Sequence, residues 1–221
     1  GLGVTINSNA TVGFVDESTF AKYQNQYGPG YGNYFTFEDI DGDGVDDQVE
    51  NYLDDASYGP AFDPNLFIYQ WDSFDPASPN YVKKSPYVAA KDGPVTFFET
   101  PITLTNSISI SNGFEQGSYR LGYTKLDQSG LLPNSQLDRH NFIFSGNFKV
   151  SEKLTATGFA NYIKTDGKGR NSTGYNDNVV GNMKQWWATS TDITEQKDIY
   201  FATRRNVGWN PGSATPGAAP I

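Results

Sequence analysis

Residues 102–111 read Ile-Thr-Leu-Thr-Asn-Ser-Ile-Ser-Ile-Ser, and this stretch decides the fold class. Apolar side chains occupy alternate positions, with Asn106 as the polar exception, and every position between them is Thr or Ser. Successive side chains of a β-strand point to opposite faces of a sheet. The alternation therefore predicts a strand with one apolar face and one polar face.

The same alternation recurs in four other segments. It is clearest in residues 2–12 and 142–150, where aliphatic or Phe side chains share one face. It is weaker in residues 118–126 and 153–163, which we also interpret as strands. The sequence thus predicts about five strands with a two-residue period.

The links between the predicted strands alternate in length. Residues 112–117 and 151–152 are short enough for hairpin turns, whereas residues 13–101 and 127–141 are long, and residues 164–221 follow the last strand. Short turns at one end and long loops at the other are typical of outer-membrane barrels. We predict an all-β fold: an antiparallel up-and-down transmembrane β-barrel segment with long extracellular loops. Because five strands cannot close a barrel, the segment would belong to a larger one.

A soluble β-sandwich is the alternative, since its sheets also have one apolar and one solvated face. The polar faces here carry mostly Ser, Thr, Asn and Gly rather than Lys and Glu, which favours a barrel lumen. Five strands interrupted by residues 13–101 would also make a poor sandwich. A secreted, calcium-stabilised β-sandwich that binds glycans remains the second hypothesis.

Composition excludes several classes of protein. The chain has 221 residues, no Cys, one His and a formal net charge of −9. An acidic balance disfavours nucleic acid as a partner, because phosphate binding needs a basic surface. Without Cys there is no disulfide framework, Cys-ligated metal site or Cys nucleophile.

Ordered motifs run through most of the chain. They include Gly1-Leu-Gly-Val-Thr-Ile-Asn-Ser-Asn9, Ala21-Lys-Tyr-Gln-Asn-Gln-Tyr-Gly28, Tyr69-Gln-Trp-Asp72 and Tyr119-Arg-Leu-Gly-Tyr-Thr-Lys-Leu-Asp-Gln-Ser-Gly130. In this order they resemble the first barrel strands and outer loops of SusC/RagA-type TonB-dependent outer-membrane transporters. The resemblance covers essentially residues 1–200 and keeps the order of that family.

The resemblance implies that residues 1–221 are the N-terminal part of a larger barrel in the bacterial outer membrane. It implies import of oligomeric nutrients, glycans or peptides, with TonB-derived energy and a SusD-like surface lipoprotein as partner. The plug, TonB box and later strands of the family are not among these residues, so TonB is expected to act through a missing N-terminal region. Residues 13–101 and 164–221 would be extracellular loop regions, and the wall would contact outer-membrane lipid.

An acidic motif occupies residues 39–50, which read Asp-Ile-Asp-Gly-Asp-Gly-Val-Asp-Asp-Gln-Val-Glu. This matches the calcium-loop pattern D-x-D-x-D-G-x5-E, with Gly44 at the sharp turn. The predicted ligands are Asp39, Asp41, Asp43, the Val45 carbonyl, Asp47 and Glu50. Asp46 stands where an EF-hand usually has an apolar residue, and no amphipathic helices flank the motif, so we expect an isolated loop.

Calcium in this loop is expected to be structural. Residues 38–55 contain nine carboxylates and no Lys or Arg, and crowding them without a counterion is unfavourable. Magnesium is less suitable because it prefers tighter octahedral shells with retained waters. A solvated acidic loop without an ion is the alternative.

Aromatic side chains supply further candidate ligand contacts. Tyr69, Trp71, Trp186 and Trp187 could stack on sugar rings, although aromatic residues also pack irregular segments. His140 is expected to be structural. No common catalytic motif occurs, so we expect no enzyme activity; a glycoside hydrolase would need two carboxylates about 5 to 10 Å apart. The tail at residues 210–221 is expected to be an irregular loop.

Overall fold

The computed structural model describes residues 1–175 and 178–211, and it is mostly β, with 42% strand and 12% helix. The chain divides into two compact units. The sheet unit comprises residues 1–15 and 98–171, and the loop unit comprises residues 16–97 and the described residues from 172 onward. The predicted irregular tail lies largely outside the described residues.

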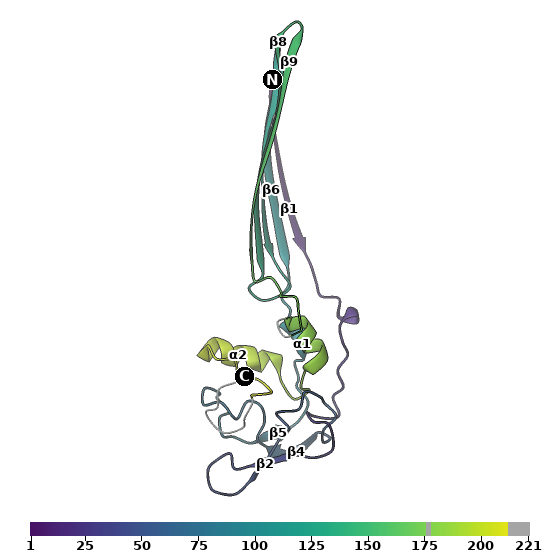
Figure 1. Cartoon of the computed structure of the whole chain (residues 1–221), viewed down its shortest axis with the longest axis vertical. Helices are drawn as coiled ribbons and strands as arrows, with labels where there is room; N and C mark the ends of the chain where they lie inside the picture. The colour runs from purple at the N-terminus through teal and green to yellow at the C-terminus, as the bar shows by residue number, and fades with distance from the viewer. Residues whose placement is uncertain (176–177, 212–221) are drawn as a thin grey trace. The chain divides into compact units, whose positions relative to one another are not determined.

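The sheet unit is one antiparallel sheet of five strands in the order β1-β6-β7-β8-β9. Its strands lie side by side in Figure 1 and are β1 (Leu2–Val12), β6 (Ile102–Phe114), β7 (Gly117–Ser129), β8 (Gln136–Ser151) and β9 (Leu154–Lys168). All five predicted strands are therefore confirmed. Consecutive strands along the chain are neighbours from β6 to β9, as in an up-and-down meander.

Two of the three links between β6 and β9 are shorter than the sequence predicts, and the third keeps its predicted length of two residues. Residues 115–116 join β6 to β7, and residues 152–153 join β8 to β9. The link between β7 and β8 shrinks from the predicted 127–141 to 130–135. Charged side chains interrupt the apolar pattern near both strand ends, yet backbone pairing continues through the Lys125–His140 and Asp127–Asp138 pairs.

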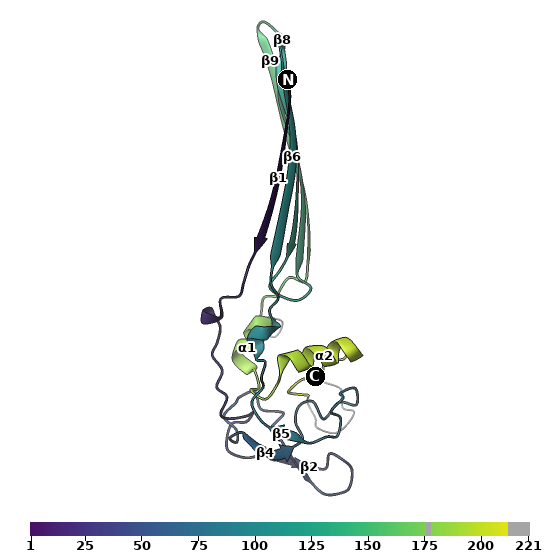
Figure 2. The ribbon, with the colours of Figure 1, turned by 180° about the vertical axis from the view of Figure 1, so that it is seen from behind.

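The sheet is open. β1 and β9 are its edge strands, and each pairs with one neighbour only among the described residues. Figure 2 shows β1 along one edge of the sheet. The structure therefore confirms antiparallel all-β architecture for this unit without closing a barrel.

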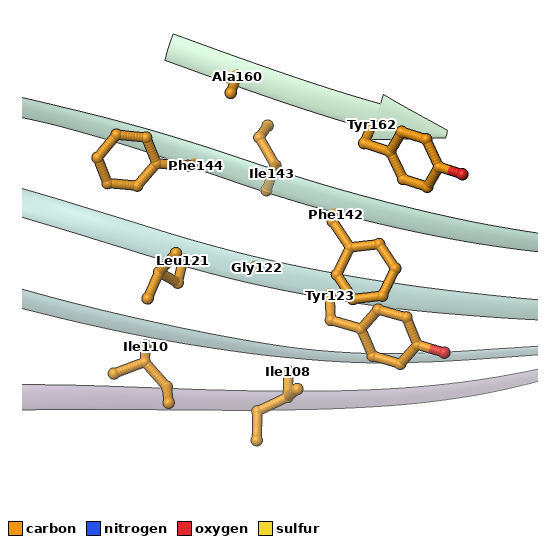
Figure 3. A pocket seen from close by; sticks show the side chains of 10 residues that line it. All are labelled: Ile108, Ile110, Leu121, Gly122, Tyr123, Phe142, Ile143, Phe144, Ala160 and Tyr162. Carbon is orange, nitrogen blue, oxygen red and sulfur yellow. The ribbon is translucent and has the colours of Figure 1, made fainter. Parts of the chain in front are cut away.

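Register aligns the apolar positions of all five strands into rows. One row of paired residues consists of Ile6, Ile108, Tyr123, Phe142 and Tyr162, and the next consists of Val4, Ile110, Leu121, Phe144 and Ala160. The members of these rows on β6 to β9 line a hollow of about 340 Å³ (Figure 3). Leu121 is nevertheless 49% exposed and Phe142 is 50% exposed, so a continuous apolar face is open to its surroundings.

The opposite face is polar. On β1 and β6 it carries Thr, Ser, Asn and Gly, as the alternation predicts. On β7 to β9 it also carries Arg120, Arg139 and Lys149, with no acidic residue on this parity, and it includes some apolar side chains such as Ile143 and Phe159. The two faces of the sheet therefore differ in both polarity and charge.

The loop unit has secondary structure of its own. Its elements are η1 (Glu17–Thr19), β2 (Thr36–Glu38), β3 (Asp47–Val49), β4 (Asp63–Ile68), β5 (Ser85–Tyr87), η2 (Pro94–Phe97), α1 (Val179–Trp186) and α2 (Ile193–Thr203). β2 pairs with β3, and β4 pairs with β5, in two separate antiparallel ribbons. In the described part of the chain, no helix is both long enough and apolar enough to cross a membrane.

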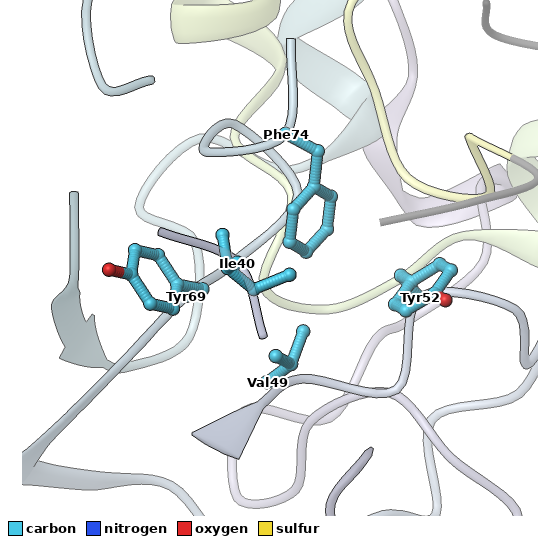
Figure 4. Packing of buried hydrophobic residues seen from close by; sticks show 5 residues of the cluster. All are labelled: Ile40, Val49, Tyr52, Tyr69 and Phe74. Carbon is cyan, nitrogen blue, oxygen red and sulfur yellow. The ribbon is translucent and has the colours of Figure 1, made fainter. Parts of the chain in front are cut away.

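Two small hydrophobic cores hold the loop unit together. One consists of Ile40, Val49, Tyr52, Tyr69 and Phe74, which converge in Figure 4. The other joins Trp71 to Ile199 and Val207. Residues described as loops from the sequence thus form a folded unit with a buried interior, because their many aromatic side chains supply large apolar areas.

Candidate metal centre

Three predicted metal ligands converge in the loop between β2 and β3. Asp39, Asp41 and Asp43 each offer a carboxylate oxygen, and these oxygens lie within 4.8 Å of one another. All three side chains are exposed. The arrangement suits a hard cation with oxygen ligands.

The backbone conformation of the loop explains why these exposed carboxylates lie close to one another. Gly42 and Gly44 have φ of 82° and 86°, values that glycine adopts without a steric penalty, so the predicted sharp turn at Gly44 is confirmed. Asp39 Oδ1 accepts from the Gly42 N–H at 2.8 Å, and Oδ2 accepts from the Gly44 N–H at 2.9 Å. Asp43 Oδ1 likewise accepts from the Val45 N–H at 2.8 Å.

The other predicted ligands lie in different surroundings. Asp47 begins β3, and its Oδ1 forms an ion pair with Lys84 Nζ at 2.7 Å, which raises the pKa of Lys84. Glu50 is 1% exposed, and its Oε1 accepts from the Trp71 N–H at 2.5 Å. The structure therefore brings together Asp39, Asp41 and Asp43 and does not include Asp47 or Glu50 in that group.

Burial dominates the electrostatics of Glu50. Desolvation raises its pKa to about 7, opposed by the nearby Ser190 hydroxyl and the Trp71 N–H, with a small further rise from Asp72. Despite the proximity of Ser190, neither Glu50 Oε2 nor Ser190 Oγ has a partner at hydrogen-bond geometry. Such a buried, partly satisfied carboxyl favours its neutral form.

The aromatic candidates separate into two pairs. Tyr69 and Trp71 are 4% and 3% exposed and belong to the two hydrophobic cores, so both side chains pack the loop unit in this structure. Ligand contact by these two residues stays a prediction. Trp186 and Trp187 are partly exposed, and the Trp186 ring lies edge-on to Tyr175 at 6.1 Å. Their role in ligand contact stays a prediction.

His140 lies on the apolar parity of β8, where its Nδ1 is 2.8 Å from the Tyr123 hydroxyl.

Sequence reasoning missed a second group of carboxyls, Asp72 and Glu195, which the Asn80 amide bridges. These residues come from segments far apart in the chain, so no local motif could have indicated the group.

Comparison with known proteins assigns no family to the chain. No protein-family model matches the sequence, and a search of curated proteins finds no significant match.

Proposed function

We propose that the chain forms part of the wall and external mouth of an outer-membrane active transporter that imports oligomeric nutrients. The observation that carries this proposal is the open apolar face of the five-stranded antiparallel sheet. A single-layered sheet with one apolar face and one polar face suits a barrel wall, whose outer side contacts lipid and whose inner side faces the lumen.

The apolar face has about the height that a bilayer requires. On β8, Phe142, Phe144, Phe148 and Val150 share this parity. Eight residue steps from Phe142 to Val150 cover about 26 Å along the strand. With a tilt of about 40°, this gives roughly 20 Å across the membrane, close to the roughly 25 Å apolar band of known barrels.

The top of the apolar face resembles a membrane boundary. The row containing Tyr123, Phe142 and Tyr162 is the last apolar row on β7 to β9. The next row of the same face is Lys125, His140 and Lys164, and the one after it is Asp127, Asp138 and Asp166. An aromatic row followed by charges is the expected order from acyl chains to water.

The boundary lies at a different level on β1 and β6. There the apolar parity continues to the Val12–Ile102 pair, six residues beyond the Ile6–Ile108 pair that belongs to the aromatic row, with the Ser8–Asn106 pair as a polar interruption. Between β6 and β7 the boundary therefore shifts by about 20 Å along the strands, while it is level within each group.

The sandwich alternative lacks a second sheet of matching size. Sandwiches bury the apolar face of one sheet against another. The other sheets of the described residues are ribbons whose strands have three to six residues, against 11 to 16 in the five-stranded sheet. Such ribbons are too small to cover the apolar face.

Energy coupling and partners rest on the resemblance to SusC/RagA-type transporters. Under the proposal, TonB acts through a region that precedes these strands, and a SusD-like lipoprotein delivers glycans or peptides to the mouth. The chain contributes no bond chemistry. Its loop unit would help to form the mouth at the cell surface.

Membrane partition tests the proposal. We expect the full-length protein to fractionate with outer membranes, to require detergent for extraction and to run faster on a gel before heating than after it, as folded barrels do. Full solubility without detergent and absence from the membrane fraction would exclude the transporter assignment. A soluble control from the same cells shows that the fractions are clean.

We further propose that the aspartate loop binds calcium as a structural ion. Asp39, Asp41 and Asp43 supply three hard oxygens in one place, and Gly44 gives the backbone turn that calcium loops need. Asp47 and Glu50 would contribute only if they left the partners they have in this structure. The remaining coordination positions would therefore be filled by the Val45 carbonyl and water.

Replacing Asp41 with Asn should weaken calcium binding by at least about 10-fold, because it removes one of three charged ligands. Isothermal titration with calcium chloride measures the loss. Asp46→Asn is the matched control: it removes the same charge from an exposed neighbour outside the cluster. Equal weakening in both variants would show that calcium affinity depends only on the net charge of the loop and that the loop has no defined calcium site.

A further inference from the structure

A second site candidate is a cavity of about 300 Å³ inside the loop unit. It lies between the segment that follows β4, the segment around β5 and the N-terminus of α2. Among its walls are Trp71, Asp72, Asn80, Val88, Ser190 and Glu195. The cavity therefore combines an acidic end with an apolar wall.

Two carboxyl groups meet at the acidic end. Asn80 Nδ2 donates to Asp72 Oδ2 at 2.5 Å and to Glu195 Oε1 at 2.8 Å, so one amide group reaches both. Asp72 is 5% exposed. Burial raises the pKa of Asp72, and burial together with the charges of Asp72 and Asp192 raises the pKa of Glu195 to about 7. Among the described residues, neither carboxyl forms an ion pair with a basic side chain, although Lys91 also lines the cavity.

An unpartnered hydroxyl lines the same cavity. Ser190 is 6% exposed, and its Oγ has no partner at hydrogen-bond geometry among the described residues, although it lies near Glu50. Buried polar atoms are almost always hydrogen-bonded in native proteins, so this hydroxyl is available to a polar group in the cavity.

The shape and composition of the cavity favour an organic cation over a metal ion. An ammonium group offers three donors, which two carboxyls and a hydroxyl can accept. A volume of about 300 Å³ with an apolar wall is at the lower end of small-molecule sites and leaves space for a carbon skeleton. In the described residues, the only group of three or more potential metal-binding side chains is Asp39, Asp41 and Asp43.

We propose that this cavity binds a small organic molecule through a primary ammonium group, which Asp72, Glu195 and Ser190 hold. The carbon skeleton packs against Trp71 and Val88. This inference goes beyond the transport proposal, because it concerns the loop unit alone and would hold for a soluble protein with the same unit.

Isothermal titration of the complete protein with n-butylamine and with 1-butanol tests the inference, because the two probes share a skeleton and differ in charge. We expect butylamine to bind at pH 8 and butanol not to bind. Glu195→Gln should weaken butylamine binding by about 10-fold or more through loss of a charge-assisted hydrogen bond. Asp198→Asn, an exposed change on the same helix outside this cavity, should leave binding unchanged.

Three results would overturn the inference. Equal binding of butanol and butylamine would show that the cavity is apolar and does not recognise charge. No binding of butylamine would show that there is no amine site. Calcium binding that is lost in Glu195→Gln would show that the cavity is a metal site. Circular dichroism confirms that each variant is folded. If Glu195→Gln does not fold, Ser190→Ala replaces it, since this change keeps both charges and should still weaken butylamine binding severalfold.

Discussion

Under the transporter proposal, replacing Leu121 with Arg should destabilise the membrane-inserted protein by about 1 to 3 kcal/mol, because a basic side chain on the lipid face costs most at the midplane of a barrel wall and less towards its boundary. Leu121 lies on the apolar face one row from the aromatic boundary row, paired with Ile110 on one side and Phe144 on the other. Denaturant titration of the complete protein in phospholipid vesicles, with and without the substitution, measures the change.

Thr124→Arg is the matched control for this substitution. Thr124 is on the same strand but on the opposite parity, paired with Ser107 and Asn141 on the polar face. A basic residue that faces a water-filled lumen avoids contact with lipid, so we expect a change below about 1 kcal/mol. Equal destabilisation by both substitutions, or none by Leu121→Arg, would show that the apolar face does not contact acyl chains.

The sheet could be predicted from sequence because side-chain parity is a local property. Thr103 to Ser111 alternate with aliphatic residues, and no tertiary information is needed to assign their faces. Strand ends were less predictable: Lys125, Asp127, Asp138 and His140 break the apolar pattern while their backbones stay paired. Pairing beyond the end of an apolar pattern depends on backbone hydrogen bonds, which hydrophobic patterns do not report.

The candidate sites were predictable only where they are local. The Asp39, Asp41 and Asp43 spacing suffices to bring three carboxylates together, because two glycines close the turn. Glu50 fits the same motif by position, yet tertiary contact with the Trp71 backbone removes it from the group. Asp72 and Glu195 meet only after α2 packs in the loop unit, so their pairing has no sequence signal.

The aromatic residues illustrate a further limit of sequence reasoning. Composition showed that the long connections are rich in Tyr, Phe and Trp, which is compatible with either ligand platforms or buried cores. Tyr69, Trp71 and Phe74 are buried and belong to the cores of the loop unit. A sequence does not reveal which aromatic side chains of an irregular segment face inward, because such segments lack a period.

Replacing Glu50 with Gln should stabilise the loop unit by up to about 3 kcal/mol at pH 8, since each pKa unit corresponds to about 1.4 kcal/mol. The folded-state pKa of Glu50 is raised from 4.5 to about 7. The folded protein therefore holds a proton that the unfolded chain releases, and the contribution of Glu50 to stability falls as pH rises from about 4.5 to 7. Gln stays neutral and keeps an acceptor for the Trp71 N–H, so its advantage should appear across this window and vanish near pH 4.

Urea unfolding followed by tryptophan fluorescence measures this advantage, because Trp71, Trp186, Trp187 and Trp209 all belong to the loop unit. Asp46→Asn is the control, as it removes the same charge from an exposed position and should show no comparable gain.

The experiment also separates two roles for Glu50. If it were the last ligand of the calcium loop, Glu50→Gln would weaken calcium binding and give no stabilisation at pH 8. If Glu50 is instead the buried carboxyl of this structure, Glu50→Gln leaves the calcium affinity unchanged. The stability advantage of this variant over the native protein then grows as pH rises.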